Sequence, residues 1–159
     1  MRLNKLFRNS VLFCLLLFGE NAIAQLNTYT FEKLDSLQKI EERPVFIFFH
    51  TDWCKYCLAM EQNVFSNDEV IELINNNFYF ISFDAEQKES VTHDGETFEY
   101  ESNGVNSGKN AIVYKYAKNN GEVSFPSLVF LWKSKTIYQE NSYLNKEELI
   151  QILTKISNL

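Results

Sequence analysis

Residues 53–57 read Trp53-Cys54-Lys55-Tyr56-Cys57, a Cys-x-x-Cys motif that lies between two strongly patterned stretches. Residues 44–50, Pro-Val-Phe-Ile-Phe-Phe-His, form a continuous apolar run, which is typical of a buried parallel strand. Residues 58–65 contain helix-forming residues and neither Gly nor Pro, which predicts a helix. The two cysteines are therefore expected where a strand ends and a helix begins, the place where sites occur in open α/β sheets.

The spacing of the two cysteines suits thiol–disulfide exchange. Two intervening residues at a helix start bring the sulfurs about one turn apart, close enough for a disulfide. Cys54 is expected at the helix N-terminus, where free amide N–H groups and the helix dipole favour a thiolate. Cysteines in such places have pKa values lowered to about 3.5–7.5 from about 8.5. We therefore expect Cys54 to be the nucleophile, and Cys57, one turn later and less exposed, to resolve the mixed disulfide.

Two other uses of a cysteine pair have to be weighed. Structural zinc needs four ligands, and the chain has no second cysteine pair and only two histidines, His50 and His93. His50 ends an apolar run, where packing is its expected role. We therefore assign no metal ligand. A structural disulfide, and metal handling by Cys54, Cys57 and His50, stay open as alternatives.

The first 24 residues predict a secretory signal peptide. Arg2, Lys5 and Arg8 form a basic segment, residues 11–18 are apolar, and residues 22–24, Ala-Ile-Ala, supply a small-x-small cleavage site. The apolar run is shorter than the ~20 residues that a membrane-spanning helix needs. We therefore expect an exported, periplasmic or extracytoplasmic protein whose remaining cysteines are a single pair.

Residues 25–159 are expected to form one domain of 135 residues. The signal peptide carries three of the 15 basic residues and one of the 21 acidic ones. The domain therefore holds 12 basic and 20 acidic residues, a net charge of −8. This excess of acid argues against nucleic-acid binding, which needs a basic patch. It identifies neither a protein partner nor an oligomeric state.

The rest of the chain is expected to alternate helices and strands. In chain order the predicted elements are a helix over 28–41, a strand over 45–50, the helix after the cysteines, a helix over 69–74, a strand over 78–83, a strand pair over 92–100, a loop over 102–109, a helix over 110–118, strands over 128–132 and 136–140, and a helix over 146–157. Asp94-Gly95 predicts a hairpin turn, residues 75–77 and Gly121 predict helix ends, and Asn145 predicts an N-cap.

Trp-Cys-x-x-Cys after a hydrophobic strand resembles the thioredoxin superfamily. The longer run over 52–57, followed by Glu61 and by Val-Phe-Ser-Asn at 64–67, is similar in particular to thioredoxin-like domains of exported bacterial proteins. The C-terminal domain of the transmembrane thiol reductase DsbD is one of them. The resemblance covers about residues 31–156. It implies an α/β fold in which a central mixed β-sheet is flanked by helices on both faces.

A second mark of the same family lies at residues 124–131, Ser-Phe-Pro-Ser-Leu-Val-Phe-Leu. This stretch resembles the thioredoxin strand that opens with a cis-proline, so the Phe125–Pro126 bond is predicted to be cis. The resemblance implies that Pro126 packs beside the sulfurs and that the backbone of Phe125 binds the substrate chain. Residues 86–109 then form an insertion before this strand, and insertions of this kind often contact partners.

The motif also departs from thioredoxin at two places. Thioredoxin has a buried Asp six residues before the first cysteine, where this chain has Phe48. Glu61, one turn beyond Cys57, is the candidate for the vacant proton-transfer role, and a solvated surface glutamate is the alternative. Lys55 and Tyr56 replace Gly-Pro between the cysteines. Lys55 could stabilise the Cys54 thiolate by its charge, and the pair helps to set the reduction potential.

The sequence thus predicts an exported thiol–disulfide oxidoreductase that acts on protein thiols and disulfides through Cys54 and Cys57. Trp53 is expected to shield the site. No bound cofactor is required, because the electrons travel in the cysteine pair. The resemblance favours the reducing direction, with a membrane thiol reductase as a possible electron donor. The alternative from another class is a non-catalytic binding or chaperone module that keeps the fold and uses the insertion to hold a partner.

Overall fold

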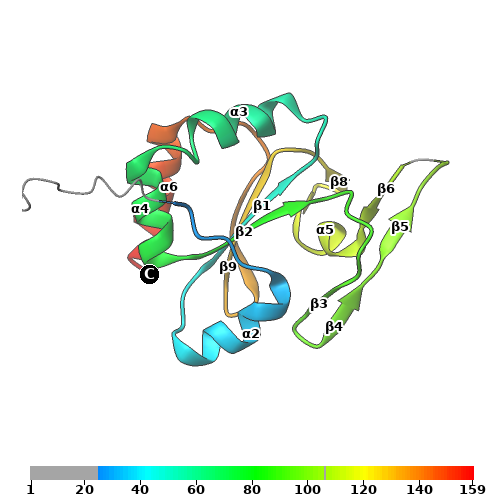
Figure 1. Ribbon diagram of the computed structural model, residues 1–159, viewed down its shortest axis with the longest axis horizontal. Coiled ribbons are helices and arrows are strands. Elements are labelled where there is room, and N and C mark those ends of the chain that lie inside the picture. The colour runs from blue at the N-terminus through cyan, green and yellow to red at the C-terminus, as the bar shows by residue number, and fades with distance from the viewer. Residues whose placement is uncertain (1–24, 106) are drawn as a thin grey trace, which may run out of the picture.

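A four-stranded sheet forms the centre of the computed structural model, which describes residues 25–105 and 107–159 (Figure 1). Its strands, in spatial order, are β10 (Lys135–Glu140), β9 (Ser127–Trp132), β1 (Val45–His50) and β2 (Tyr79–Asp84). β1 runs parallel to β2 and antiparallel to β9, and β9 runs antiparallel to β10. The predicted mixed sheet is confirmed. The expected signal peptide, residues 1–24, lies outside the described residues.

Helices cover both faces of the sheet, as the fold prediction requires. One face carries α3 (Lys55–Asn63), α4 (Asp68–Asn77) and α6 (Lys146–Ser157), and the other carries α2 (Phe31–Ile40) and α5 (Ala111–Tyr116). Figure 1 shows α4 and α6 side by side, with α2 and α5 on the opposite side of the strands. Among the described residues, no helix has the length and the apolar character needed to cross a bilayer.

The apolar run that predicted a buried strand supplies side chains to both layers. Val45, Ile47 and Phe49 pack under α2 and α5, whereas Phe46 and Phe48 pack under α3, α4 and α6. All five are nearly or fully buried. Burying a Phe side chain contributes roughly 1.5–3 kcal/mol, so the three Phe residues of this strand hold it firmly between the two layers. It also fixes the position of the motif that follows it.

Two predicted helix boundaries were wrong. The first helix begins at Phe31 rather than residue 28, because Thr30 has the extended backbone of an N-cap (φ −103°, ψ 159°). Helix α4, predicted over 69–74, does not end before residues 75–77. It includes them and ends at Asn77, because Phe78 is the first residue to return to extended backbone. The predicted N-cap at Asn145 is confirmed, and Asn145 forms a full capping box with Glu148. Asn67 caps α4 in the same way, through its side-chain oxygen.

The insertion contains two hairpins. β3 (Val91–His93) and β4 (Glu96–Phe98) pair around Asp94-Gly95, which confirms the predicted turn. The predicted loop over 102–109 was too long. β5 (Tyr100–Ser102) and β6 (Gly108–Asn110) pair there, with Ser102 opposite Gly108. A Cβ at Gly108 would lie 2.3 Å from the Glu101 carbonyl oxygen, so glycine allows this close pairing.

The prediction that Gly121 ends a helix was also wrong. α5 ends at Tyr116, and Gly121 lies instead in a hairpin between β7 (Lys118–Asn119) and β8 (Glu122–Val123). Asn120 and Gly121 both have positive φ values, 50° and 91°, as a two-residue hairpin turn requires. The glycine at residue 121 correctly indicated a position with left-handed backbone. A glycine alone does not distinguish the end of a helix from a hairpin turn.

Candidate active site

Strand β1 and helix α3 place the cysteine pair at the carboxyl edge of the sheet. His50 is the last residue of β1, and Cys54 is the N-cap of α3. A turn between them is closed by a hydrogen bond from the Cys54 amide to the Thr51 carbonyl oxygen (3.1 Å). The predicted position of the motif, where the strand ends and the helix begins, is confirmed.

Cys54 and Cys57 form a disulfide, with an S–S distance of 2.03 Å and 5.2 Å between the Cα atoms. The Cys54 sulfur also accepts a hydrogen bond from the Cys57 amide (3.1 Å), so the sulfur itself caps the helix. Cys54 is 6% exposed and Cys57 is 1% exposed. Cys54, at the helix N-terminus, is therefore the more exposed residue of the pair, and the assignment of nucleophile and resolving cysteine stays a prediction.

Aromatic side chains surround the disulfide and reach the solvent. Trp53 is 64% exposed and packs edge to face against Phe125, with ring centroids 6.2 Å apart. Tyr56 is 66% exposed and faces Tyr143 at 6.4 Å. Trp53 and Phe125, 72 positions apart in the chain, thus meet at this surface. Tyr143 belongs to the same surface and was missed, because nothing in its sequence neighbourhood indicates the site.

The Phe125–Pro126 peptide bond is cis, as predicted. Pro126 is buried, and Phe125 is partly buried against the core cluster that contains both cysteines. The residue before the proline therefore lies against the core cluster that contains the disulfide. Its proposed use of backbone groups to bind a substrate chain stays a prediction.

Asn141 is a positioning residue that the sequence analysis missed. Its Oδ1 accepts hydrogen bonds from the buried Ser127 hydroxyl (3.1 Å) and from the Gln139 amide (2.9 Å). Its Nδ2 lies 3.3 Å from both Ser124 Oγ and the Ala117 carbonyl oxygen, and donates to them. These bonds fasten the chain on both sides of the cis-proline. Only the fold brings residue 141 to this place, so no local pattern could have revealed it.

The remaining predicted residues are arranged as follows. Lys55 and Glu61 are both exposed, on the first and second turns of α3. Phe48 is fully buried and packs against Phe65 at 4.8 Å, so an apolar side chain fills the place of the thioredoxin acid. Glu61 faces the solvent, and its role in proton transfer stays a prediction.

The cysteines belong to no metal-binding group in the part of the chain that the structure describes. Within residues 25–105 and 107–159, the only group of three or more potential ligands consists of Asp35, His93 and Asp94. His50 is half-buried and stacks on Phe48 with ring centroids 5.4 Å apart. Packing, the role expected for His50, is what the structure shows. The metal-handling alternative has no geometric support at this site.

Comparison with known proteins gives a family and a fold. The model of the thioredoxin-like domain family matches residues 31–157. "Spermatogenesis-associated protein 20" of Rattus norvegicus is 33% identical over 60 residues, which cover 38% of this chain and only 8% of that relative. The match therefore spans under a tenth of the relative's length.

Solved structures share the fold over most of both chains. A structure described as "DsbH Oxidoreductase" covers 88% of this chain and 90% of its own, with a TM-score of 0.62 and 17% identity. A structure described as a disulphide isomerase from Xylella fastidiosa Temecula1 covers 79% and 87%, with a TM-score of 0.54 and 15% identity. At these identities the similarity shows the fold. The chemistry has to be argued from the cysteine pair.

Proposed function

This chain belongs to the thioredoxin-like domain family, and from that membership we propose that it is a thiol–disulfide oxidoreductase acting on protein substrates. The observation that carries the proposal is the Cys54–Cys57 disulfide at the N-terminus of α3. A disulfide serves exchange when one sulfur can be reached and the other is protected. As whole residues, Cys54 is slightly more exposed than Cys57, at 6% against 1%. No bound cofactor is needed.

The exchange proceeds through a mixed disulfide. In the reduced protein, the Cys54 thiolate attacks a sulfur of the substrate disulfide, forms a new S–S bond and releases one substrate thiolate. The Cys57 thiolate then attacks the Cys54 sulfur and releases the second substrate thiolate. Two electrons pass from the cysteine pair to the substrate, and the disulfide of the structure is re-formed. The free amides at the start of α3 stabilise the Cys54 thiolate.

The surface around the disulfide favours apolar substrate segments. Trp53, Tyr56 and Tyr143 are exposed aromatic residues, and exposed aromatic clusters mark binding sites. Phe125 joins Trp53 at the rim, and its backbone next to the cis-proline is the expected hydrogen-bonding partner of the substrate chain. The proposed substrates are therefore proteins that present a disulfide within an extended apolar segment.

We propose the reducing direction, with a membrane thiol reductase as the electron donor. The support is the resemblance of residues 52–67 to the C-terminal domain of DsbD and its soluble relatives. The equilibrium reduction potential of the cysteine pair tests the direction. A value near about −270 mV fits a reductant, whereas one near about −120 mV would identify an oxidant.

We also propose that the protein is exported. The support is the basic, apolar and Ala-Ile-Ala pattern of residues 1–24. The N-terminal residue of the protein isolated from its own cells tests this proposal. Gln25 is the expected first residue, and a chain that keeps residues 1–24 in the cytoplasm would contradict it.

Reduction of insulin disulfides tests the activity. Cys54→Ala should lower the rate to background, and Cys57→Ala should accumulate mixed disulfides that run as larger species on a non-reducing gel. The assay uses the chain that begins at Gln25, in which Cys54 and Cys57 are the only cysteines. If Cys54→Ala kept its activity, the nucleophile would be wrong. If a Cys54→Ser/Cys57→Ser chain kept its biological function, the protein would instead be a binding or chaperone module.

A further inference from the structure

His93 is a buried histidine whose ring has no hydrogen-bond partner. It is the last residue of β3, it is 4% exposed, and both of its ring nitrogens are unpaired. Its ring lies between those of Phe31 and Tyr116, at 5.2 and 5.8 Å. Burial lowers the pKa of the imidazole, while Asp94 acts in the opposite direction. An unpaired buried polar group costs roughly 1–3 kcal/mol, so its presence requires an explanation.

Two carboxylates lie next to this ring. Asp94 follows His93 in the β3–β4 turn, and its Oδ2 is 3.6 Å from His93 Nε2. Asp35 comes from helix α2, which packs against β3. One possible ligand atom from each of the three residues lies within 4.8 Å of the other two. A buried nitrogen thus faces two oxygens that come from different elements.

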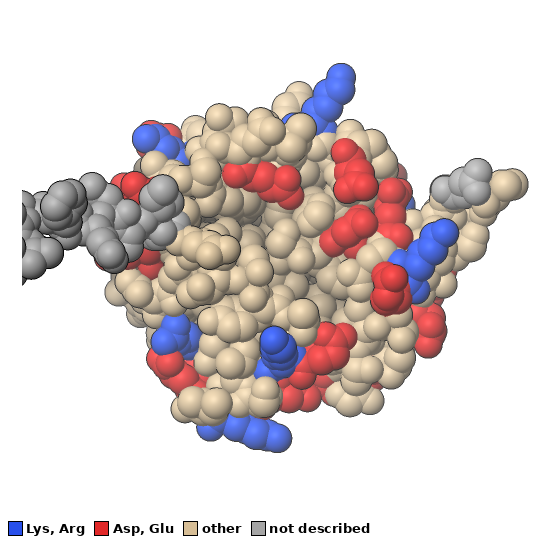
Figure 2. Space-filling view, viewed as in Figure 1, with Lys and Arg blue, Asp and Glu red and all other residues tan. Residues whose placement is uncertain are grey.

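A cavity of about 450 Å³ opens beside the three residues. Its lining includes all three of them together with Leu34, Trp132 and Lys133, and includes neither cysteine. Figure 2 shows acidic side chains, with a basic one among them, over the region where Figure 1 places α2 and the β3–β4 turn. The Lys115 ammonium near this region is paired with Glu96 at 2.6 Å. The lining also includes Lys39 and Lys133, and Lys133 is paired with Glu42 at 3.4 Å. Solvent and small ions can therefore reach the carboxylates of Asp35 and Asp94 beside His93.

We propose that Asp35, His93 and Asp94 bind a divalent first-row transition metal ion such as Zn²⁺. One imidazole nitrogen and two carboxylate oxygens form a suitable ligand set, with bonds of about 2.0–2.2 Å and water in the remaining positions. Ligands of one ion lie about 3–3.5 Å apart at these bond lengths. Asp35 and Asp94 are exposed and can turn toward the ion, whereas His93 is held by its aromatic neighbours.

The ion would join the insertion to the body of the protein. His93 and Asp94 belong to the first hairpin of the insertion, and Asp35 belongs to a helix that covers the sheet. Bound metal stabilises the folded state because the unfolded chain does not hold the three ligands together. This site lies apart from the cysteine pair. The proposal is thus independent of the oxidoreductase function.

Metal binding by the full chain, with Cys54 and Cys57 in their disulfide, tests the proposal. The disulfide prevents the two thiols from binding the added ion. Equilibrium dialysis against Zn²⁺ followed by metal analysis should give one ion per chain, and Co²⁺ should produce visible d–d absorption bands. Saturating Zn²⁺ should raise the Tm by about 5 °C.

Three variants with matched controls localise the site. Asp35→Asn and Asp94→Asn should each weaken Zn²⁺ binding more than about tenfold, and His93→Gln should do the same. The two aspartates are exposed, and Asn tolerates the left-handed backbone of residue 94 (φ 53°), so these variants should fold. Asp52→Asn and His50→Gln are the controls and should bind as the parent chain does. Failure of the parent chain to bind Zn²⁺ would overturn the proposal. So would Asp35→Asn and Asp94→Asn variants that bind Zn²⁺ as tightly as the parent chain does.

Discussion

At the amino ends of β1 and β2, where Val45 pairs with Tyr79, helices α2 and α4 end. At the carboxyl ends, where His50 pairs with Asp84, helix α3 begins. A helix that precedes a strand presents its C-terminal carbonyl groups at the amino end, and a helix that follows a strand presents its amides at the carboxyl end. The amino ends of the two strands thus lie beside helix carbonyl groups, and we call them the carbonyl edge. The carboxyl ends lie beside helix N–H groups, and we call them the amide edge.

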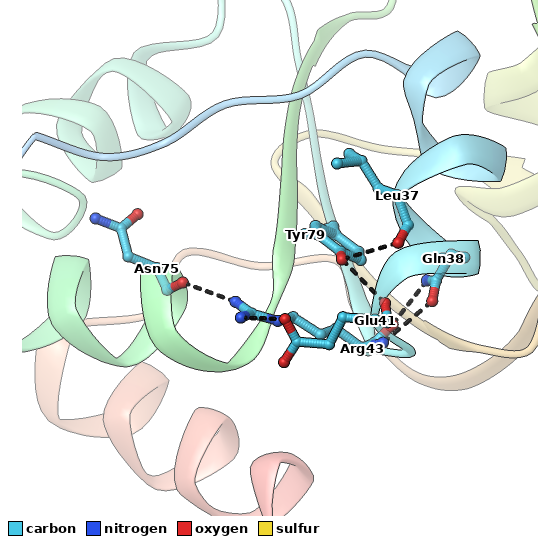
Figure 3. A network of polar contacts seen from close by, with 6 residues as sticks. All are labelled: Leu37, Gln38, Glu41, Arg43, Asn75 and Tyr79. Atoms are coloured by element: carbon cyan, nitrogen blue, oxygen red, sulfur yellow. Dashed lines mark hydrogen bonds and ion pairs between the residues drawn. The ribbon is translucent and has the colours of Figure 1, made fainter.

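Side chains close the carbonyl edge (Figure 3). The Tyr79 hydroxyl is 2.9 Å from the Glu41 carbonyl oxygen and 3.2 Å from that of Leu37, both at the end of α2. Arg43 donates to the Asn75 carbonyl oxygen near the end of α4 (3.1 Å) and to the Glu41 carboxylate (2.6 Å). Carbonyl oxygens at the ends of α2 and α4 thus accept hydrogen bonds from side chains, which stabilises the folded state.

The amide edge keeps its groups available for chemistry. Only the sulfur of Cys54 caps the start of α3, and reduction frees that sulfur as the thiolate that the amides stabilise. Exposed aromatic side chains lie around Cys54 at the amide edge. The carbonyl edge instead has polar side chains that bind the helix ends. We therefore expect substitutions at the carbonyl edge to change the free energy of unfolding, and substitutions at the amide edge to change the rate of exchange.

Asn141→Ala should give the largest effect, because this residue supports both the free energy of unfolding and the rate of exchange. Loss of the amide leaves the buried Ser127 hydroxyl unpaired and loosens the chain around the cis-proline. We expect the free energy of unfolding to fall by about 2–3 kcal/mol and the rate of insulin reduction to fall with it. Urea unfolding and the insulin assay measure the two effects. Asn158→Ala, which removes an exposed amide, is the control, and an unchanged urea midpoint for Asn141→Ala would contradict the positioning role.

Arg43→Met tests the carbonyl edge. The methionine keeps the apolar stem but removes the bond to the Asn75 carbonyl oxygen and the contact of the guanidinium with the Tyr79 ring (5.7 Å). We expect a loss of about 1–2 kcal/mol in urea unfolding, with an exchange rate unchanged within about twofold. Lys33→Met, an exposed site on α2, should be neutral in both measurements. A large fall in exchange rate for Arg43→Met would show that the two edges are not independent.

Tyr79→Phe removes a single hydroxyl from the same edge. The loss of its hydrogen bond should cost about 1 kcal/mol at neutral pH. Burial raises the pKa of Tyr79, while Arg43 acts in the opposite direction. The neutral phenol is therefore favoured in the folded state, and its contribution is present below pH ~10 and is lost as the pH rises toward the folded-state pKa. Tyr79→Phe should reduce the alkaline loss of stability, which urea midpoints between neutral and alkaline pH measure. An alkaline loss equal to that of the parent chain would contradict this role.

The parts of the site that the sequence predicted depend on local patterns. The Cys-x-x-Cys spacing, the apolar run before it and the proline at residue 126 each describe a few neighbouring positions. The parts that it missed join distant positions. Asn141 reaches Ser124 and Ser127 because β10 pairs back on β9, and a single sequence does not contain that proximity.

The same limit applies to the wrong predictions about the fold. Asn120-Gly121 correctly indicated left-handed backbone, but α5 ends earlier, and pairing of β7 with β8 converts these residues into a turn. Asp35 and His93 are 58 positions apart in the sequence, so no ligand spacing could have indicated their proximity. Local chemistry was predictable, whereas long-range pairing was not.

Glu86→Ala should give the smallest change in stability and tests how the insertion affects the amide edge. The Trp53 indole N–H donates to Glu86 Oε1 (3.1 Å), so the first residue of the insertion orients the largest exposed side chain of the motif. The pair is exposed, and its loss should change the free energy of unfolding by less than about 0.5 kcal/mol. Freed from this bond, the indole should bind substrates less well, which raises the KM for a protein disulfide while kcat stays constant.

Fluorescence separates this orienting role from a purely structural one. The chain has two tryptophans, so a Trp132→Phe background leaves Trp53 as the only indole emitter. In that background Glu86→Ala should shift the Trp53 emission, Glu86→Gln should restore it because the amide oxygen still accepts a bond, and Glu89→Ala should leave it unchanged. An emission shift without a change in KM would mean that the insertion positions Trp53 for something other than substrate. A change in KM without an emission shift would mean that Glu86 itself contacts the substrate.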